Sequence, residues 1–468
     1  MNNYEAILVV YKKVGHLLGK LMYSGSSSGF DRDQSPKDNE NINRNKLFNA
    51  FRSFRYKNFL MFWINCCVWD AASWSITLVS TWLTYSITKS ALATALVIGL
   101  PMISSVVVSP IIGVLADNMN RKRLLVYLSI VQGMVISIFA VLVFMGQISI
   151  WYIYILVFIN GVFANARSPL RMSIIPNLVP KNFILNALSL QYIANSSVRF
   201  LLPLIMGFVI KFFGSGVSLS IAAILYTLSV LFLLKISVEF NKDYHVSVKE
   251  VGTEFLQGVR YLIREKLLLG TTCLIFMMLF CITSINLSLM PVYAVQVFDA
   301  GPEGAGILIA CSGIGITLAG ILTAFRTTQD GINHFVMIRL AIAISIMYII
   351  FSRITIFEIG AFSFIISTML VGMFWLATET HIQQNVHGSY RGRVSSLIVS
   401  GAGISLLFGF IFLGYISDLV GVQTATLLSC LILIICIITF LILRQRIFTN
   451  SNSVNEIVGG ISGKDIVS

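Results

Sequence analysis

The sequence predicts an all-α polytopic membrane protein, with twelve transmembrane helices arranged as two six-helix halves. A helix needs roughly 20 apolar residues to cross a ~30 Å hydrocarbon core, and runs of that length recur along the chain between short polar breaks. Of the 468 residues, 56% are hydrophobic and only 11% are charged, whereas a soluble domain carries about 25% charged residues. A water-soluble fold could not bury this much apolar surface.

The predicted spans fall into two sets of six, separated by one long hydrophilic stretch. The first set comprises residues 59–87, 91–116, 124–146, 150–172, 186–212 and 215–236. The second set comprises residues 268–297, 304–325, 335–353, 357–380, 394–417 and 422–445.

The domain organisation follows from these spans. We predict an N-terminal cytoplasmic extension (1–51), a first bundle (52–236), a central cytoplasmic loop (237–267), a second bundle (268–446) and a disordered C-terminal tail (447–468). Within the extension, apolar residues at helical spacing over 1–22 predict a helix lying on a membrane surface, followed by a disordered linker.

The net charge of +13 is distributed unevenly across the predicted topology. With both termini in the cytoplasm, Lys89, Lys211 and Arg353 fall outside and Arg199 falls within the membrane. Every other Lys and Arg is assigned to cytoplasmic tails and loops, which is the positive-inside pattern. The excess positive charge therefore indicates topology and contact with anionic lipid, and argues against nucleic acid as a partner.

An internal repeat supports the division into halves. Residues 207–214 (GFVIKFFG), which end the fifth span, are echoed by residues 414–421 (GYISDLVG), which end the eleventh. Repeated six-helix halves are typical of secondary transporters, in which two bundles rock about a site near the middle of the membrane.

The loop between the second and third spans carries a recognisable motif. It reads GVLADNMNRKR over residues 113–123, and it resembles the signature G-x-L-A-D-R-x-G-R-K of the major facilitator superfamily. The resemblance extends over about residues 52–445. The runs SPLR at 168–171 and RGRV at 391–394 are similar to those of the efflux group that includes the enterobactin exporter and macrolide efflux proteins. Asn118 and Asn120 depart from the signature, which usually has Arg and Gly there.

The resemblance implies the major facilitator fold and a monomeric exporter in the bacterial inner membrane. Its expected cargo is an amphipathic small molecule, drug-like, macrolide-like or siderophore-like, exchanged for protons by alternating access. Two alternatives stay open: a dedicated siderophore or lipid-like substrate exporter, and a non-transporting sensor or scaffold. The sequence contains no phosphate-binding G-x-x-x-x-G-K-[ST] loop and no catalytic or metal-ligand spacing, so we expect neither an enzyme nor a cofactor or metal.

The motif residues are the expected gating elements. By the resemblance, Gly113 lets the second span approach the eleventh, and Asp117 lies near the N-terminus of the eleventh span. A helix dipole stabilises a carboxylate there by about 0.3 to 1 kcal/mol. Arg121, Lys122 and Arg123 would hold that carboxylate in place. Arg171 occupies a matching motif position at the inner end of the fourth span, where a gating or structural role is expected.

Two charged residues lie deep in predicted spans. Asp70 is eleven residues into the first span and Arg199 is thirteen into the fifth. An ionised side chain at such depth costs at least ~2.5 kcal/mol, so residues of this kind usually face a cavity and have a function in transport. Asp70 is the candidate proton carrier, or alternatively a structural partner of Arg199, because their spans are neighbours in the resembled fold.

Further candidates are aromatic or lie near the ends of spans. Trp69 and Trp74 either line a substrate cavity or pack in the core. Glu379, a second candidate for proton coupling, and His381 fall at the cytoplasmic end of the tenth span, and Asp418 lies near the outer end of the eleventh. Interfacial solvation is the alternative explanation for these three residues.

Overall fold

The computed structural model describes residues 52–118, 121–236, 257–324, 334–387, 390–439 and 441. The predicted N-terminal extension, much of the central loop and the C-terminal tail lie outside these residues, so their organisation stays a prediction. In the described part of the chain every regular element is a helix, as predicted.

The first half is built from long helices that follow the predicted spans. After a short 3₁₀ turn at Arg52–Arg55, they are α3 (Lys57–Thr88), α4 (Ala91–Asn118), α5 (Arg121–Phe144), α6 (Ile150–Leu178) and α7 (Ile184–Leu234). α7 is two helices joined at a kink, because Gly214 has φ 84° and ψ 167°. This left-handed-side conformation suits glycine, which has no Cβ to clash. The predicted break between the fifth and sixth spans is therefore present.

The second half begins with a helical stretch at 257–264, inside the predicted central loop. It continues through α9 (Lys266–Met278), a π-helical turn (Leu279–Thr283), α10 (Ser284–Ser288), α11 (Met290–Gln296), α12 (Pro302–Ala324), α13 (His334–Arg353), α14 (Phe357–Asn385) and α15 (Arg391–Val420). A last helix spans Val422–Thr439.

The prediction of one continuous helix over 268–297 was wrong. The segment is divided by the π-helical turn at Leu279–Thr283 and by a break at Leu289, where φ is −96° and ψ is 0°. Pro291 follows that break at the start of α11. A proline has no N–H to donate and its ring clashes with the preceding turn, so an α-helix breaks or kinks there.

Ten described helices are long and apolar enough to cross a membrane. α7 counts once among them although it contains two helices, and the 28-residue α4 is not among them. The total of twelve crossings stays a prediction: it requires both parts of α7 and also α4 to span the bilayer.

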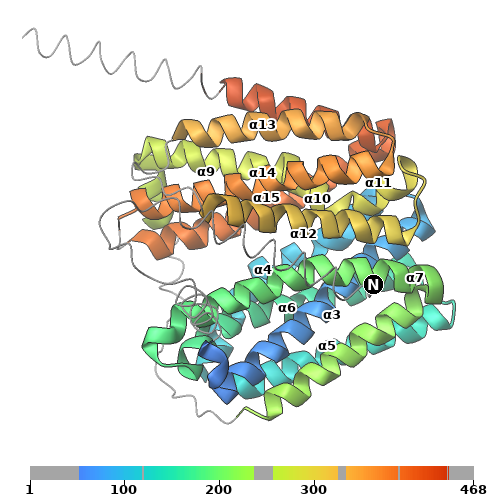
Figure 1. The fold of residues 1–468 in the computed structure, drawn as a ribbon, viewed down its shortest axis with the longest axis vertical. Coiled ribbons are helices and arrows are strands. Elements are labelled where there is room, and N and C mark those ends of the chain that lie inside the picture. Colours follow the sequence, from blue (N-terminus) through green and yellow to red (C-terminus); the bar gives the residue numbers. More distant parts are fainter. Residues whose placement is uncertain are drawn as a thin grey trace, which may run out of the picture.

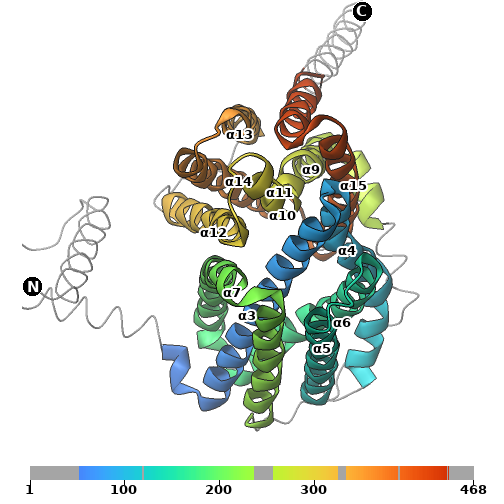
Figure 2. The same cartoon turned by 90° about the vertical axis from the view of Figure 1, so that its right-hand side faces the viewer.

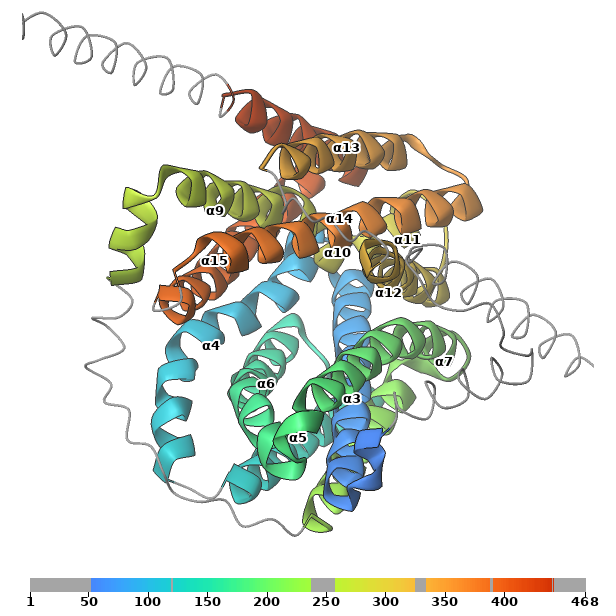
Figure 3. The ribbon, with the colours of Figure 1, turned by 60° about the vertical axis from the view of Figure 1, so that its left-hand side comes forward.

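The two halves form two bundles that meet along two pairs of helices. Figure 1 shows α3–α7 (blue to green) in one body and α9–α15 (yellow-green to red) in the other. The turned views show α4 beside α15 and α7 beside α12 (Figure 2 and Figure 3). Trp69, Ile76, Ile285 and Tyr293 belong to one buried apolar cluster that includes residues of both halves.

Glycines of the internal repeat allow the halves to approach closely. A Cβ on Gly207 of α7 would lie 2.8 Å from the Pro302 carbonyl oxygen of α12, and one on Gly414 of α15 would lie 2.6 Å from Leu92 Cα of α4. Both repeats then end at a glycine with positive φ, 84° at Gly214 and 83° at Gly421. The sequence repeat is therefore also a structural one, and its glycines serve close helix packing.

Gly306→Val should weaken the contact between α7 and α12. A Cβ on Gly306 would overlap the Pro203 carbonyl oxygen, and no flexible side chain is there to yield. Such overpacking costs about 1 to 3 kcal/mol, so thermal unfolding in detergent should occur at a lower temperature. Gly320→Val is the matched control on the same helix, because nothing lies within 4 Å of a Cβ there. Equal unfolding temperatures for the two variants would contradict this account of the packing.

Candidate functional site

Asp70 forms a buried ion pair in the first half. Arg171 Nη1 of α6 donates to Asp70 Oδ1 at 3.0 Å and to Oδ2 at 3.1 Å. Asn195 Nδ2 of α7 donates to Oδ2 at 3.0 Å. The Asp70 side chain is 4% exposed and that of Arg171 is 16% exposed. Three helices thus hold one carboxylate that is charge-paired and hydrogen-bonded, the condition under which a buried charge is tolerated.

The predicted pairing of Asp70 with Arg199 was wrong. Arg199 lies with its guanidinium carbon 5.0 Å from the centre of the Trp74 ring instead. The physical reason is the length of α6, which continues to Leu178 and so keeps Arg171 inside the bundle. Asn195, one turn before Arg199 on α7, is the residue that reaches Asp70.

Arg167 is a buried cation that the sequence analysis missed. It is 1% exposed, and it donates to Ser129 Oγ at 2.9 Å and to Asn65 Oδ1 at 2.5 Å. Its guanidinium also lies 4.7 Å from the centre of the Trp69 ring. The assignment of this arginine to a loop or tail was therefore wrong, because it lies inside α6. Its position within the apolar run 150–172, one turn before Arg171, was the available signal.

Trp69 is a packing residue in this structure. It is 8% exposed, and its indole Nε1 donates to Gln132 Oε1 at 2.9 Å. Gln132 Nε2 in turn donates to Asn160 Oδ1 at 3.3 Å. Of the two roles considered for Trp69, the geometry favours packing in the core. The half-buried Trp74 instead presents its ring face to the Arg199 guanidinium.

Polar contacts between the described residues of the two halves lie at one end of the molecule, the end where α3 stops and α4 starts, which we call the Lys89 end. Asp418 of α15 accepts hydrogen bonds from Ser90 Oγ and the Ala91 N–H, both at 2.6 Å, and from the Leu92 N–H at 3.1 Å. It therefore caps the N-terminus of α4 from the other half, a stronger role than interfacial solvation.

A second polar contact joins the halves at the Lys89 end. Lys211 Nζ of α7 lies 2.7 Å from Glu303 Oε1 of α12, and both side chains are partly exposed. Lys211 and Asp418 occupy equivalent positions of the internal repeat. Each reaches the first residues of a helix in the opposite half.

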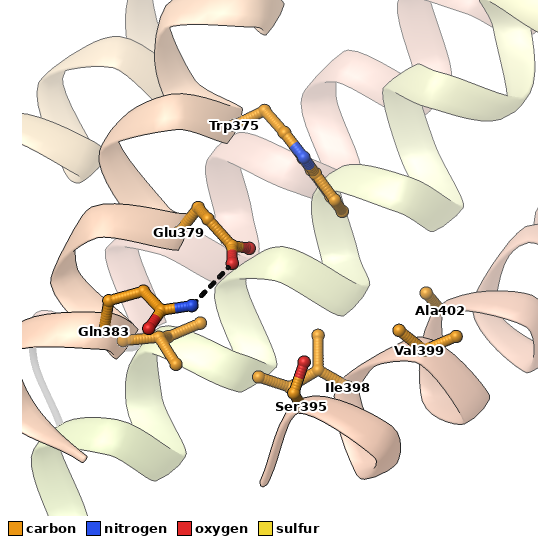
Figure 4. A pocket seen from close by; sticks show the side chains of 8 residues that line it. Trp375, Glu379, Gln383, Ser395, Ile398, Val399 and Ala402 are labelled. Atoms are coloured by element: carbon orange, nitrogen blue, oxygen red, sulfur yellow. Dashed lines mark hydrogen bonds between the residues drawn. The ribbon is translucent and has the colours of Figure 1, made fainter. Parts of the chain in front are cut away.

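Glu379 lines a cavity of about 260 Å³ between α14 and α15. Figure 4 shows Glu379 with Trp375 and Gln383 on one side, and Ser395 and Ile398 on the other. Gln383 Nε2 donates to Glu379 Oε1 at 3.2 Å. His381 is buried, and its ring Nδ1 lies 3.3 Å from Asn385 Nδ2. The cavity therefore presents a single carboxylate beside an indole.

The gating motif is only partly visible. Gly113 and Asp117 lie within α4, but their side chains are outside the described part, so their roles stay predictions. Lys122 Nζ donates to the Leu234 and Ile236 carbonyls at the end of α7. A cation at a helix C-terminus is favourable, so Lys122 ties α5 to α7 within the first half. The described residues include no group of His, Cys, Asp and Glu suited to a metal ion.

Comparison with known proteins finds membrane transporters of similar sequence and fold. The chain is 24% identical to the staphyloferrin A transporter of Staphylococcus aureus (71% of this chain, 83% of the relative). It is 22% identical to macrolide efflux protein A of Streptococcus pyogenes (75% and 86%). Its fold matches an inward-facing, unoccupied bacterial homologue of the human lysosomal transporter Spinster at TM-score 0.68 and 15% identity (85% and 98%).

A family model described as transmembrane secretion effector matches residues 48–458, which is most of the chain. The described helices, the paired halves and the buried charges agree with that match. The chain therefore belongs to this family of the major facilitator superfamily, whose members are multi-pass membrane transporters of small molecules and not enzymes.

Proposed function

We propose that this protein exports amphipathic small molecules from bacterial cells by proton antiport with alternating access. The observation that carries the proposal is the buried pair of Asp70 and Arg171, held by three helices of one half. A carboxylate in the membrane-spanning part of a transporter commonly serves as a proton site. The efflux relatives support export as the direction.

The geometry suggests how a proton could change the structure. Protonation of Asp70 would remove its negative charge, and Arg171 would then lose the partner that offsets its burial. An uncompensated buried cation is costly, so Arg171 would move toward another acceptor or toward water. Binding and release of the proton would thereby favour different arrangements of α3, α6 and α7, which is the differential interaction that coupling requires.

Contacts at the Lys89 end support alternating access. The carboxylate cap at Asp418, the Lys211–Glu303 pair and the glycine contacts all join the halves there. For the halves to rock apart at this end, these contacts must break together. We further propose that Asp117, by the family resemblance, serves the matching purpose at the opposite end.

Cysteine labelling in intact cells tests the proposed topology. With native cysteines replaced, Lys89→Cys should react with a membrane-impermeant thiol reagent, whereas Lys249→Cys in the central loop should resist it. The reason is the positive-inside pattern, which places both termini and the loop in the cytoplasm of an inner-membrane protein. Equal labelling of the two positions would overturn the topology.

Transport itself is tested with the purified protein in proteoliposomes. An untargeted comparison of compounds exported by cells with and without the protein supplies the substrate. The recovered compound should then move uphill when a pH gradient is imposed and stop when the gradient is collapsed. Uphill movement driven only by another ion would reject proton antiport, and no flux under any gradient would favour a sensor or scaffold.

A siderophore or lipid-like substrate is the second candidate within transport. It is favoured by the relative in Staphylococcus aureus, which is a staphyloferrin A transporter. Recovery of an iron-chelating compound in the export comparison would support it. Recovery of drug-like or macrolide-like compounds in the same comparison would instead support the broader export proposal.

A further inference from the structure

Arg199 is a half-buried arginine with no carboxylate partner among the described residues. Its Nε atom is buried and has no hydrogen-bond acceptor. The ion pairs found in the described part join Arg171 to Asp70 and Lys211 to Glu303. The contact that Arg199 does make is with the face of the Trp74 ring.

Arg199 lies one helical turn from the proposed proton site. Asp70 and Trp74 are four residues apart on α3, and Asn195 and Arg199 are four apart on α7, so each pair shares a helix face. Asn195 contacts Asp70, and Arg199 contacts Trp74. The two contacts are thus successive rungs between α3 and α7, separated by a pitch of about 5.4 Å.

The charges buried in the first half do not balance. Three arginines, Arg167, Arg171 and Arg199, lie with one described carboxylate, Asp70. Arg167 is surrounded by neutral acceptors and an indole face, and Arg171 is paired. Arg167 and Arg199 are therefore both without a carboxylate among the described residues, but Arg167 has two neutral hydrogen-bond acceptors, whereas Arg199 has only the Trp74 ring face. An apolar environment penalises a cation in that situation until an anion arrives.

Arg199 lies beside a contact between the two halves. The next residue, Phe200, packs against Gly313 of α12, and this contact between α7 and α12 continues towards the Lys89 end. Tyr192, two turns earlier on the same face of α7 as Arg199, is 66% exposed. The exposed apolar stripe of α7, including Leu201 and Ile205, lies on the opposite face. Arg199 thus points away from that stripe, beside an exposed part of the α7 surface.

We propose that Arg199 and Trp74 form the anion-binding part of the substrate site, so that the exported amphipathic molecule carries a carboxylate. This inference rests on the proposed export function and adds the substrate class to it. The guanidinium would form a charge-assisted hydrogen-bonded pair with the carboxylate. The indole, already beside the guanidinium, would contact the planar or apolar body of the molecule.

A matched pair of probes tests the proposal on the full-length protein in detergent. 1-Naphthylacetate and 1-naphthylacetamide share one ring system, but only the first carries a charge. Equilibrium dialysis should show at least tenfold tighter binding of the acid. Arg199→Gln should remove this preference by weakening the acid alone, Arg199→Lys should keep part of it, and Trp74→Ala should weaken both probes alike.

Arg353→Gln is the control, because this exposed arginine ends α13 at the far side of the second half. The Arg353→Gln protein should prefer the acid as strongly as the unchanged protein does. The proposal is overturned if the unchanged protein binds neither probe, if it shows no preference, or if Arg199→Gln keeps the preference. It is also overturned if Arg199→Gln lowers the thermal unfolding temperature, since that would reveal a structural partner.

Because dialysis needs no gradient and no flux, its result is independent of proton coupling. If the unchanged protein shows no preference for the acid over the amide, the carboxylate site is rejected. Export would then still be judged by the proteoliposome measurement. Intact preference without uphill transport would reject the export mechanism instead.

Discussion

Asp70→Asn should lower pH-driven uphill transport at least tenfold while leaving substrate binding measurable. The amide keeps the shape of the side chain and can still accept a hydrogen bond from Asn195, but it cannot serve as a proton carrier. The measurement is transport into proteoliposomes under an imposed pH gradient, compared with downhill exchange in its absence.

A folding defect would also lower transport, so a second variant is needed to separate folding from proton coupling. Removing one partner of a buried ion pair costs about 3 to 5 kcal/mol, because the other charge is left uncompensated. Asp70→Asn alone is therefore expected to reduce the yield of folded protein. Adding Arg171→Gln should restore that yield without restoring pH-driven transport, because the pair is with Arg171 and not with Arg199.

Glu358→Gln is the control for loss of a carboxylate, since Glu358 is exposed in the first turn of α14. Its transport should match that of the unchanged protein. Near-normal pH-driven transport by well-folded Asp70→Asn would eliminate Asp70 as the coupling residue. The carboxylate of Glu379, in the cavity between α14 and α15, would then be the next to examine.

Asp418→Asn should shift the protein toward forms that are open at the Lys89 end. The substitution removes a charge that accepts three hydrogen bonds from the first residues of α4. Losing a cap of this kind costs about 0.5 to 2 kcal/mol, and 1.4 kcal/mol corresponds to a tenfold change in the closed-to-open ratio. Spin labels at Ile87 and Val420, both exposed, should report longer distances across this end.

Asp299→Asn is the matched control for that measurement. Asp299 is exposed near the start of α12 and has a positive φ of 48°, which asparagine tolerates. Its distance distribution should be unchanged. If Asp418→Asn gave the same distribution as this control, the cap would not contribute to closure.

The helices were predictable because their length and composition are set by the bilayer. The repeat at 207–214 and 414–421 marked two helix ends correctly, and the structure adds that its glycines lie at close contacts between the halves. The break near Leu289 was missed, because apolar composition alone does not report where a proline interrupts hydrogen bonding. Hydropathy detects a span, but it is insensitive to the continuity of its backbone.

The sequence was sufficient to identify individual residues of the candidate site, but not to identify which residues contact each other. Asp70 was identified because a carboxylate deep in an apolar span stands out. Its partner depends on which faces of α6 and α7 turn toward α3, and that rotation is set by packing among many side chains. Arg167 was overlooked because it was counted with the arginines of the cytoplasmic tails and loops, whereas α6 continues beyond both Arg167 and Arg171.

The two polar contacts at the Lys89 end, the Lys211–Glu303 pair and the Asp418 cap, place different constraints on the sequence. Lys211 meets the side chain of Glu303, so a substitution at one position alters the value of the other. Asp418 binds mainly to the N–H groups of Ala91 and Leu92, which every residue except proline provides. Among homologous sequences, positions 211 and 303 should therefore covary, whereas position 418 should vary independently of 91 and 92.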